Sequence, residues 1–286
     1  MFLIKNLFNL GEILKFRVSI LGFIFAIIGV YLSGQVESLR QISTLIALLV
    51  VPLTIFFAFV VNDIVDADLD KLTKPHRAIP SGKVTLRDAI ILAIILAISA
   101  LLISWMTGIA SGIFATVNLF LCVAYSLWFK QTLLLGNMTT AYLNASVIVY
   151  GSLSVSAVNG MIIWVAALIF FFSLAYEILY AVEDLQGDTK GGVMTTAHYL
   201  GRTKSLWLIR GLCLFVIAIA MIPLLSGSVS ILFLISMGVL CVIPVLWVTY
   251  KLSPGTGDEV IRRSRTVLTF IYYLSVIPIL ILHTGF

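Results

Sequence analysis

Acidic residues are scarce in this 286-residue chain, and most of them gather in two short stretches. Of the 13 Asp and Glu residues, four fall between positions 63 and 70 and four between positions 177 and 188. The two sets are Asp63, Asp66, Asp68 and Asp70, and Glu177, Glu183, Asp184 and Asp188. Like charges this close together repel one another and are costly to desolvate near a membrane, so the clusters indicate that cations offset them.

The spacing within each stretch suits a metal-bound diphosphate. Asn62, Asp66 and Asp70 follow at i, i+4 and i+8, which places them along one stripe of a helix. Asp184 and Asp188 repeat the i, i+4 spacing. Hard oxygen donors suit Mg²⁺, which takes one or two protein carboxylates together with phosphate oxygens of a substrate. Two such clusters facing each other predict a site for a diphosphate held between Mg²⁺ ions, and the predicted catalytic metal ligands are Asp63, Asp66, Asp70, Asp184 and Asp188.

Basic residues follow both acidic stretches, where they can bind phosphate oxygens that Mg²⁺ leaves free. They are Lys71, Lys74, His76, Arg77 and Lys83 after the first stretch, Lys190, Arg202 and Lys204 after the second, and Lys130 on the same predicted side. Arg77 is the leading candidate because Pro75 and Pro80 fix a stiff, non-helical path around it. The basic residues near the chain ends are interpreted as topology signals: Lys5, Lys15, Arg262, Arg263 and Arg265.

Long apolar segments must position these groups. The chain is 61% hydrophobic and 11% charged, with a mean hydropathy of +1.14, whereas soluble domains are roughly 45–50% apolar and 25% charged. This composition excludes a soluble domain, a disordered chain, a secreted disulfide scaffold and a nucleic-acid-binding domain. We predict an all-α polytopic membrane protein, a single domain over residues 1–286 with nine transmembrane helices. Their ranges are 16–34, 41–62, 86–106, 109–128, 136–157, 160–183, 205–225, 228–250 and 266–284.

The distribution of charge predicts the orientation in the membrane. With nine spans, 17 of the 18 Lys and Arg residues lie on the side of the N-terminus and of both acidic stretches, and Arg40 is the exception. The positive-inside rule assigns that side to the cytoplasm and the C-terminus to the outside. The two longest polar connections, about 63–85 and 184–204, are then cytoplasmic. Function is expected there.

Several motifs resemble those of the UbiA superfamily of intramembrane prenyltransferases. Asn62-Asp63-x-x-Asp66-x-x-x-Asp70 resembles the first aspartate motif of that family, and Asp184-x-x-x-Asp188 resembles the second. The resemblance extends to Lys74-Pro75-His76-Arg77-Ala78-Ile79-Pro80-Ser81-Gly82, to Tyr125 with Lys130, and to Gly136-Asn137. It implies a helical bundle whose central cavity is capped by cytoplasmic loops, and Mg²⁺ at the paired aspartates to bind and ionise an isoprenyl diphosphate. The substrate-binding residues expected on this basis are Asn62, Arg77, Tyr125, Lys130, Asn137, Glu177, Tyr180 and Lys190.

The remaining chemistry concerns the allylic cation and its acceptor. Aromatic faces can stabilise such a cation, and the candidates are Tyr125, Tyr142, Tyr176 and Tyr180. Glu177 and Tyr180 are candidates for taking the proton of the acceptor.

The form Glu183-Asp184-x-x-Gly187-Asp188 resembles the branch of the family that makes archaeal ether lipids. The favoured reaction therefore transfers a geranylgeranyl-class group from its diphosphate to a lipophilic acceptor in the membrane, a geranylgeranylglyceryl phosphate-type ether lipid precursor. That branch commonly has an Arg just before the position of Glu177, where this chain has Tyr176.

Four alternatives stay open. Two are transfer to an aromatic or quinone precursor and chlorophyll-type transfer, and a third is intramembrane terpene cyclisation without an acceptor. The fourth, a secondary transporter, is disfavoured because transporters bind ions near the bilayer midplane, whereas most of these acids stand at helix ends. No nucleic-acid partner is expected.

Overall fold

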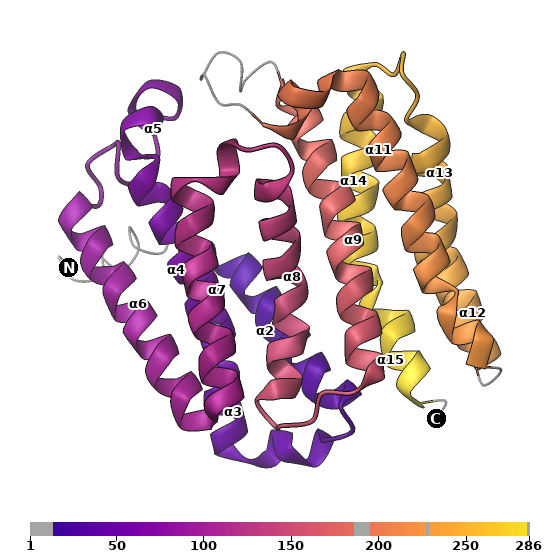
Figure 1. The fold of residues 1–286 in the computed structure, drawn as a ribbon, viewed down its shortest axis with the longest axis horizontal. Coiled ribbons are helices and arrows are strands. Elements are labelled where there is room, and N and C mark those ends of the chain that lie inside the picture. Colours follow the sequence, from indigo (N-terminus) through magenta and orange to yellow (C-terminus); the bar gives the residue numbers. More distant parts are fainter. Residues whose placement is uncertain (1–13, 186–194, 227–228, 285–286) are drawn as a thin grey trace. The chain divides into compact units, whose positions relative to one another are not determined.

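The computed structural model of the chain describes residues 14–185, 195–226 and 229–284. Within these ranges all regular elements are helices (Figure 1), which confirms the all-α prediction. Their bounds are α2 Phe16–Leu32, α3 Ile42–Leu48, α4 Val50–Val65, α5 Ala67–Thr73, α6 Leu86–Thr107, α7 Ile109–Leu127, α8 Leu135–Leu153, α9 Gly160–Glu183, α11 Thr196–Ala220, α12 Ile231–Met237, α13 Ile243–Lys251, α14 Asp258–Leu274 and α15 Val276–Thr284. Short 3₁₀ turns lie at Val36–Arg40, Phe129–Gln131 and Ile222–Ser226, and a π-helical turn at Gly238–Val242 joins α12 to α13.

Seven helical stretches among the described residues are long and apolar enough to cross a membrane. They are Ile42–Val65, Leu86–Thr107, Ile109–Leu127, Gly160–Glu183, Thr196–Leu225, Ile231–Lys251 and Asp258–Leu282. Each overlaps a predicted span, and the stretches that begin at Thr196 and Asp258 start nine and eight residues before the predicted spans 205–225 and 266–284. The other two predicted spans correspond to α2 and α8. Helix α2 has 17 residues, about 26 Å at 1.5 Å per residue, which is short of the roughly 30 Å hydrocarbon core. The count of nine spans therefore stays a prediction.

The chain divides into two compact units, and each carries one of the acidic stretches. The first unit comprises Met1–Phe129 with Ser146–Ile162, and the second comprises Lys130–Ala145 with Ile163–Phe286. In the first unit, α4 packs against α2, α6 and α7. Helix α4 therefore contacts three other helices of its unit, and the first acidic stretch lies at its C-terminal end.

Glycine allows α2 and the C-terminal half of α8 to approach closely within the first unit. A Cβ atom added at Gly151 would lie 2.0 Å from the carbonyl oxygen of Ala26. A Cβ atom added at Gly29 would lie 2.3 Å from the carbonyl oxygen of Ile148. Small residues at such crossings let helix backbones pack directly on one another.

Replacing Gly151 by Ala is expected to destabilise the protein by about 1–3 kcal/mol, because the new methyl group meets a backbone oxygen that cannot rotate away. The measurement is thermal unfolding of the purified protein in detergent. Gly211→Ala in α11 is the matched control, since nothing lies within 4 Å of its added Cβ atom. The control should be neutral or slightly stabilising, because Ala is the better helix former. Equal melting temperatures for both variants would contradict the close crossing.

In the second unit, α11 packs against α13, α13 against α14, and α12 against α15. Helix α9 joins α11 through Trp164, whose indole Nε1 donates a hydrogen bond of 2.8 Å to the carbonyl oxygen of Ile219. The C-terminal end of α9 presents the second acidic stretch, and α14 contacts it there through side chains described below.

Candidate active site

The first acidic stretch keeps helical spacing through the junction of α4 and α5. The helix assignment breaks at Asp66, yet the N–H of Asp66 donates to the carbonyl oxygen of Asn62 at 2.9 Å, and the N–H of Asp70 donates to that of Asp66 at 2.8 Å. The side-chain amide of Asn62 also donates to Oδ2 of Asp66 at 3.1 Å. The predicted i, i+4, i+8 stripe is therefore confirmed.

Arg77 completes this first cluster. Its Nη1 lies 2.6 Å from Oδ2 of Asp70 and 3.4 Å from Oδ1 of Asp63. The side chain of Asp70 is only 5% exposed and that of Arg77 is 28% exposed. A buried carboxylate is stable only when it is paired, so Arg77 supplies the charge that Asp70 needs.

The loop after α5 folds back on itself and thereby holds Arg77 in place. The N–H of Arg77 donates to the carbonyl oxygen of Lys74 at 3.0 Å, and the N–H of Ser81 donates to that of Arg77 at 2.9 Å. The buried residues Ala78 and Val84 anchor the loop. Gly82 has a φ of +75°, a left-handed conformation that glycine adopts without a steric penalty. The loop is non-helical, as the two prolines predicted.

Lys15 adds a cation that the sequence analysis had assigned to topology alone. Its ammonium nitrogen lies 4.2 Å from the centre of the Phe59 ring, a cation–π contact with α4. Burial lowers the pKa of Lys15, while the charge of Asp63 opposes that shift and the charge of Arg77 adds to it. Lys15 thus belongs to the electrostatic environment of the first cluster. Its position before α2 carried no local sign of this, because the contact depends on how α2 packs against α4.

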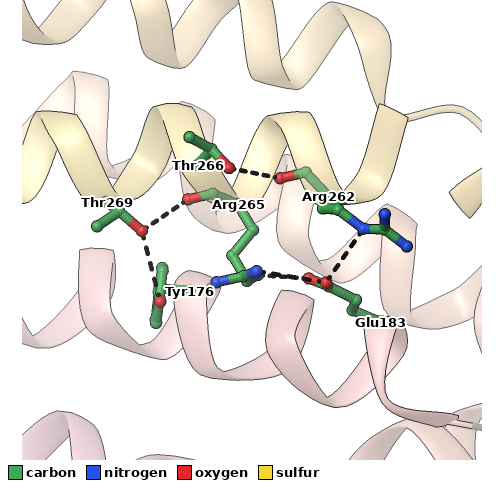
Figure 2. A network of polar contacts seen from close by, with 6 residues as sticks. All are labelled: Tyr176, Glu183, Arg262, Arg265, Thr266 and Thr269. Carbon is green, nitrogen blue, oxygen red and sulfur yellow. Dashed lines mark hydrogen bonds and ion pairs between the residues drawn. The ribbon is translucent and has the colours of Figure 1, made fainter. Parts of the chain in front are cut away.

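The second cluster lies where α9 meets α14, and Figure 2 shows its contacts. The guanidinium group of Arg265 donates to both carboxylate oxygens of Glu183, from Nε to Oε2 and from Nη2 to Oε1 at 3.4 Å. Nε of Arg262 lies 3.8 Å from Oε1 of Glu183. Oγ1 of Thr269, one turn further along α14, donates to the hydroxyl of Tyr176 at 3.5 Å. The sequence pattern indicates a topology role for both arginines, and the structure adds a contact that this pattern did not predict: they pair with an acid of the second stretch.

Tyr180 connects this cluster to Asp184, the first aspartate of the second motif. The N–H of Asp184 donates to the carbonyl oxygen of Tyr180 at 3.0 Å. The ring centre of Tyr180 lies 5.8 Å from the guanidinium carbon of Arg265. Glu177 is half-buried on the same helix. Asp188 of this motif and Lys190, which is predicted to bind substrate, lie outside the described residues.

The other predicted site residues lie on α7, α8 and the turn between them. Asn137 accepts a short hydrogen bond from Oγ1 of Thr196, which in turn accepts from the N–H of Leu134 at 3.0 Å. This contact ties the start of α8 to the start of α11 within the second unit. Tyr125 is half-buried on α7 in the first unit, and Lys130 is half-buried in the turn Phe129–Gln131.

The first cluster fits Mg²⁺ by the chemistry of its donors. The carboxylate and amide oxygens of Asn62, Asp66 and Asp70 are hard ligands of the kind that Mg²⁺ prefers. In the described part of the chain, no group of three or more His, Cys, Asp and Glu side chains gathers as a complete metal cage. Mg²⁺ needs only one or two protein carboxylates when phosphate oxygens and water complete its coordination. The donor set therefore suits an ion that binds together with a diphosphate.

A cavity of about 60 Å³ lies within the second unit, lined by apolar side chains of α9, α11, α14 and neighbouring helices, among them Phe172, Val216, Met237 and Tyr272. Ligand pockets usually enclose about 300–1,000 Å³, so this cavity is too small for a long isoprenyl chain. The central cavity that was expected from the sequence stays a prediction.

Fold and site together define a multi-pass membrane protein with acidic clusters at helix ends, in which Asp63, Asp70 and Glu183 pair with arginines. The sequence pattern described as the UbiA prenyltransferase family matches residues 22–282. This chain therefore belongs to the UbiA prenyltransferase family and is an integral membrane prenyltransferase.

Two similar proteins carry the same name. The chain is 27% identical over 238 residues to the digeranylgeranylglyceryl phosphate synthase of Korarchaeum cryptofilum, covering 83% of this chain and 84% of that protein. It is 30% identical to the synthase of the same name from Methanococcus aeolicus, again covering 83% and 84%.

Solved structures share the fold. A structure described as digeranylgeranylglyceryl phosphate synthase in membranes superposes with a TM-score of 0.85 at 25% identity, covering 98% of this chain and 99% of that one. A UbiA homologue from Archaeoglobus fulgidus bound to GPP and Mg²⁺ gives a TM-score of 0.65 at 16% identity, covering 94% and 99%.

Proposed function

We propose that this protein transfers a geranylgeranyl-class isoprenyl group from its diphosphate to a geranylgeranylglyceryl phosphate-type acceptor in the membrane, with Mg²⁺ as cofactor. The observation that carries the proposal is the first cluster, where a helical stripe of carboxylates is paired with Arg77 at 2.6 Å. In such a set the carboxylate oxygens can bind the metal ion, and the guanidinium group can bind the oxygens of the diphosphate. The second stretch, from Glu183 to Asp188, is proposed to act on the same diphosphate.

The reaction follows from these groups. The bond between C1 of the isoprenyl chain and the diphosphate oxygen breaks, and the leaving diphosphate keeps the electron pair. Arg77 and Lys130 stabilise the charge that grows on this leaving group. Bound Mg²⁺ supplies further Lewis-acid stabilisation of the diphosphate oxygens. The acceptor hydroxyl then forms a C–O bond at C1, and its proton passes to a nearby base, for which Glu177 and Tyr180 are the candidates.

Aromatic and apolar side chains are proposed to protect the allylic cation from water. The ring faces of Tyr125 and Tyr180 attract a cation through their quadrupoles. Tyr180 already lies beside a cationic group, since its ring centre is 5.8 Å from the guanidinium carbon of Arg265.

The similar proteins support the choice of acceptor. Two synthases that match over 83% of this chain carry the name digeranylgeranylglyceryl phosphate synthase, and so does the structure with a TM-score of 0.85. An acceptor that carries a phosphate needs cations of its own. The second unit offers Arg262, whose side chain is largely exposed and whose Nε lies 3.8 Å from the Glu183 carboxylate that Arg265 already pairs with.

The test uses purified protein in detergent with Mg²⁺ and geranylgeranyl diphosphate. Diphosphate release is measured with and without geranylgeranylglyceryl phosphate, and products are identified by mass. Release that requires the acceptor and yields the doubly prenylated lipid is the expected result. Mg²⁺-dependent release without any acceptor, giving a hydrocarbon or an alcohol, would instead indicate a cyclase. Release only with an aromatic acceptor would move the protein to the quinone or chlorophyll-type branch.

The membrane arrangement is also part of the proposal. We infer nine spans in a single domain, with the N-terminus and both acidic stretches in the cytoplasm and the C-terminus outside. The distribution of 17 of the 18 Lys and Arg residues supports this orientation. Reporter fusions at the two termini test it, since they should report opposite sides of the membrane.

A further inference from the structure

The ion pair between Arg265 and Glu183 differs from ordinary surface pairs in this chain. It joins α14 to the last residue of α9, 82 positions apart in the sequence, through both carboxylate oxygens (Figure 2). A guanidinium group that contacts both oxygens of a carboxylate fixes its direction as well as its place. The side chain of Glu183 is 18% exposed and that of Arg265 is 29% exposed.

A second pair on α14 provides the comparison. Arg263 and Glu259 lie four residues apart on this helix, and Nη2 of Arg263 lies 2.5 Å from Oε1 of Glu259. The Arg263 side chain is 71% exposed and that of Glu259 is 75% exposed. Exposed pairs of this kind contribute little or nothing measurable to stability. The pair between Arg265 and Glu183 is partly buried and links two helices, so it costs more to desolvate than an exposed pair and fixes one helix against the other.

Further contacts fasten Arg265 along one face of α9. Tyr176, Tyr180 and Glu183 follow at i, i+4 and i+7, which places them on the same side of the helix. The guanidinium carbon of Arg265 lies 5.8 Å from the ring centre of Tyr180, and its guanidinium group pairs with Glu183. Thr269, one turn further along α14, donates to the hydroxyl of Tyr176 at 3.5 Å. The last two turns of α9 are thus held by one arginine and its neighbour.

Asp184 follows directly after this fastened face. Glu183 is its neighbour in the chain, and the N–H of Asp184 donates to the carbonyl oxygen of Tyr180 at 3.0 Å. Arg265 is therefore linked to Asp184 indirectly, through Glu183 and through Tyr180. Among the described interactions, none joins Arg265 directly to Asp184.

We propose that Arg265 is a positioning residue for Asp184, the first aspartate of the second motif. By holding Glu183 and Tyr180, Arg265 orients the Asp184 carboxylate so that it can bind the metal ion of a metal diphosphate. This inference rests on the proposed function, because it takes Asp184 to be a metal ligand. Groups that orient metal ligands typically change metal affinity or activity by about 10- to 100-fold when they are replaced. Replacing either residue of the pair should therefore weaken metal binding as well as lower turnover.

The experiment compares Arg265→Gln, Glu183→Gln, the double variant and Arg265→Lys with Arg263→Gln as the matched control. Binding of Mn²⁺, used as a stand-in for Mg²⁺, is titrated by electron paramagnetic resonance in the presence of diphosphate. We expect about tenfold weaker Mn²⁺ binding for either single variant and no further loss in the double variant. Arg265→Lys should recover part of the affinity, since it keeps the charge but loses the two-pronged contact. Arg263→Gln should bind as the unaltered protein does.

Three results would overturn the inference. Glu183→Gln that binds Mn²⁺ normally while Arg265→Gln does not would mean that Arg265 contacts substrate directly. Normal Mn²⁺ binding in both variants with only a lower melting temperature would leave the pair a structural one. Additive losses in the double variant would mean that the two residues act separately.

Asp184→Asn, measured in parallel, separates this inference from the proposed function. Mn²⁺ binding that survives Asp184→Asn would remove Asp184 from the metal site, whatever Arg265 does. A loss in Asp184→Asn together with normal binding in Arg265→Gln would overturn the positioning role alone.

Discussion

Replacing Asp66 by Asn is expected to lower Mg²⁺-dependent diphosphate release by on the order of 10²–10³-fold, the usual cost of removing a group that stabilises transition-state charge. The variant keeps the size of the side chain and an oxygen that can accept from the amide of Asn62, which donates to Asp66 at 3.1 Å. The variant loses the negative charge with which Asp66 is expected to bind the metal ion of the metal diphosphate. Release of inorganic diphosphate from geranylgeranyl diphosphate is the measurement.

Asp68→Asn is the matched control for this prediction, because Asp68 lies in the same stretch but points away from the cluster. Its side chain is 93% exposed and pairs with Lys71 at 2.7 Å. Turnover of the control should be close to that of the unaltered protein, and both variants should melt at similar temperatures. Near-normal turnover in Asp66→Asn would remove the first aspartate motif from the chemistry.

Replacing Arg77 by Gln is expected to affect both stability and substrate binding. The buried carboxylate of Asp70 would lose its partner at 2.6 Å, which costs about 1–3 kcal/mol or more for a charged group. The KM for the isoprenyl diphosphate should rise by about 10-fold or more, since a charge-assisted contact to phosphate is worth about 1.5–3 kcal/mol. Thermal unfolding and steady-state kinetics measure the two effects.

A second substitution separates the two roles of Arg77. Adding Asp70→Asn to Arg77→Gln removes the unpaired charge, so the melting temperature should recover while diphosphate turnover stays low. Arg87→Gln serves as the matched control, because Arg87 is an exposed arginine at the start of α6 and on the same predicted side of the membrane. Unchanged KM and kcat in Arg77→Gln would return Arg77 to a purely structural or topological role.

The first cluster could be predicted from the sequence because its geometry is local. Asn62, Asp66 and Asp70 need only the 3.6-residue period of a helix to share a face, and the backbone bonds across Asp66 preserve that period. Arg77 lies seven residues after Asp70, within reach of a loop that two prolines and Gly82 force to turn back. Short-range stereochemistry decides such contacts.

The second cluster could be predicted only in part. Glu183 and Asp184 were placed correctly at the end of a span, but Arg265 was counted with the topology charges. Nothing in the residues around position 265 points to Glu183, because the two are 82 positions apart and meet only through the packing of α14 on α9. Lys15 was missed for the same reason, since its contact with Phe59 depends on the packing of α2 against α4.

The sequence by itself determined that the chain is helical and membrane-embedded, and where its acidic motifs stand, because burial in lipid requires helices and the spacing of side chains along a helix is periodic. Only the tertiary structure decided which cations the second acidic stretch receives. In a low-dielectric environment each carboxylate needs a partner, and several arginines and lysines of equal charge were available along the chain. The local turn of the loop brought Arg77 to Asp70, whereas helix packing selected Arg265 for Glu183, because that ion pair depends on distances that the order of residues does not contain.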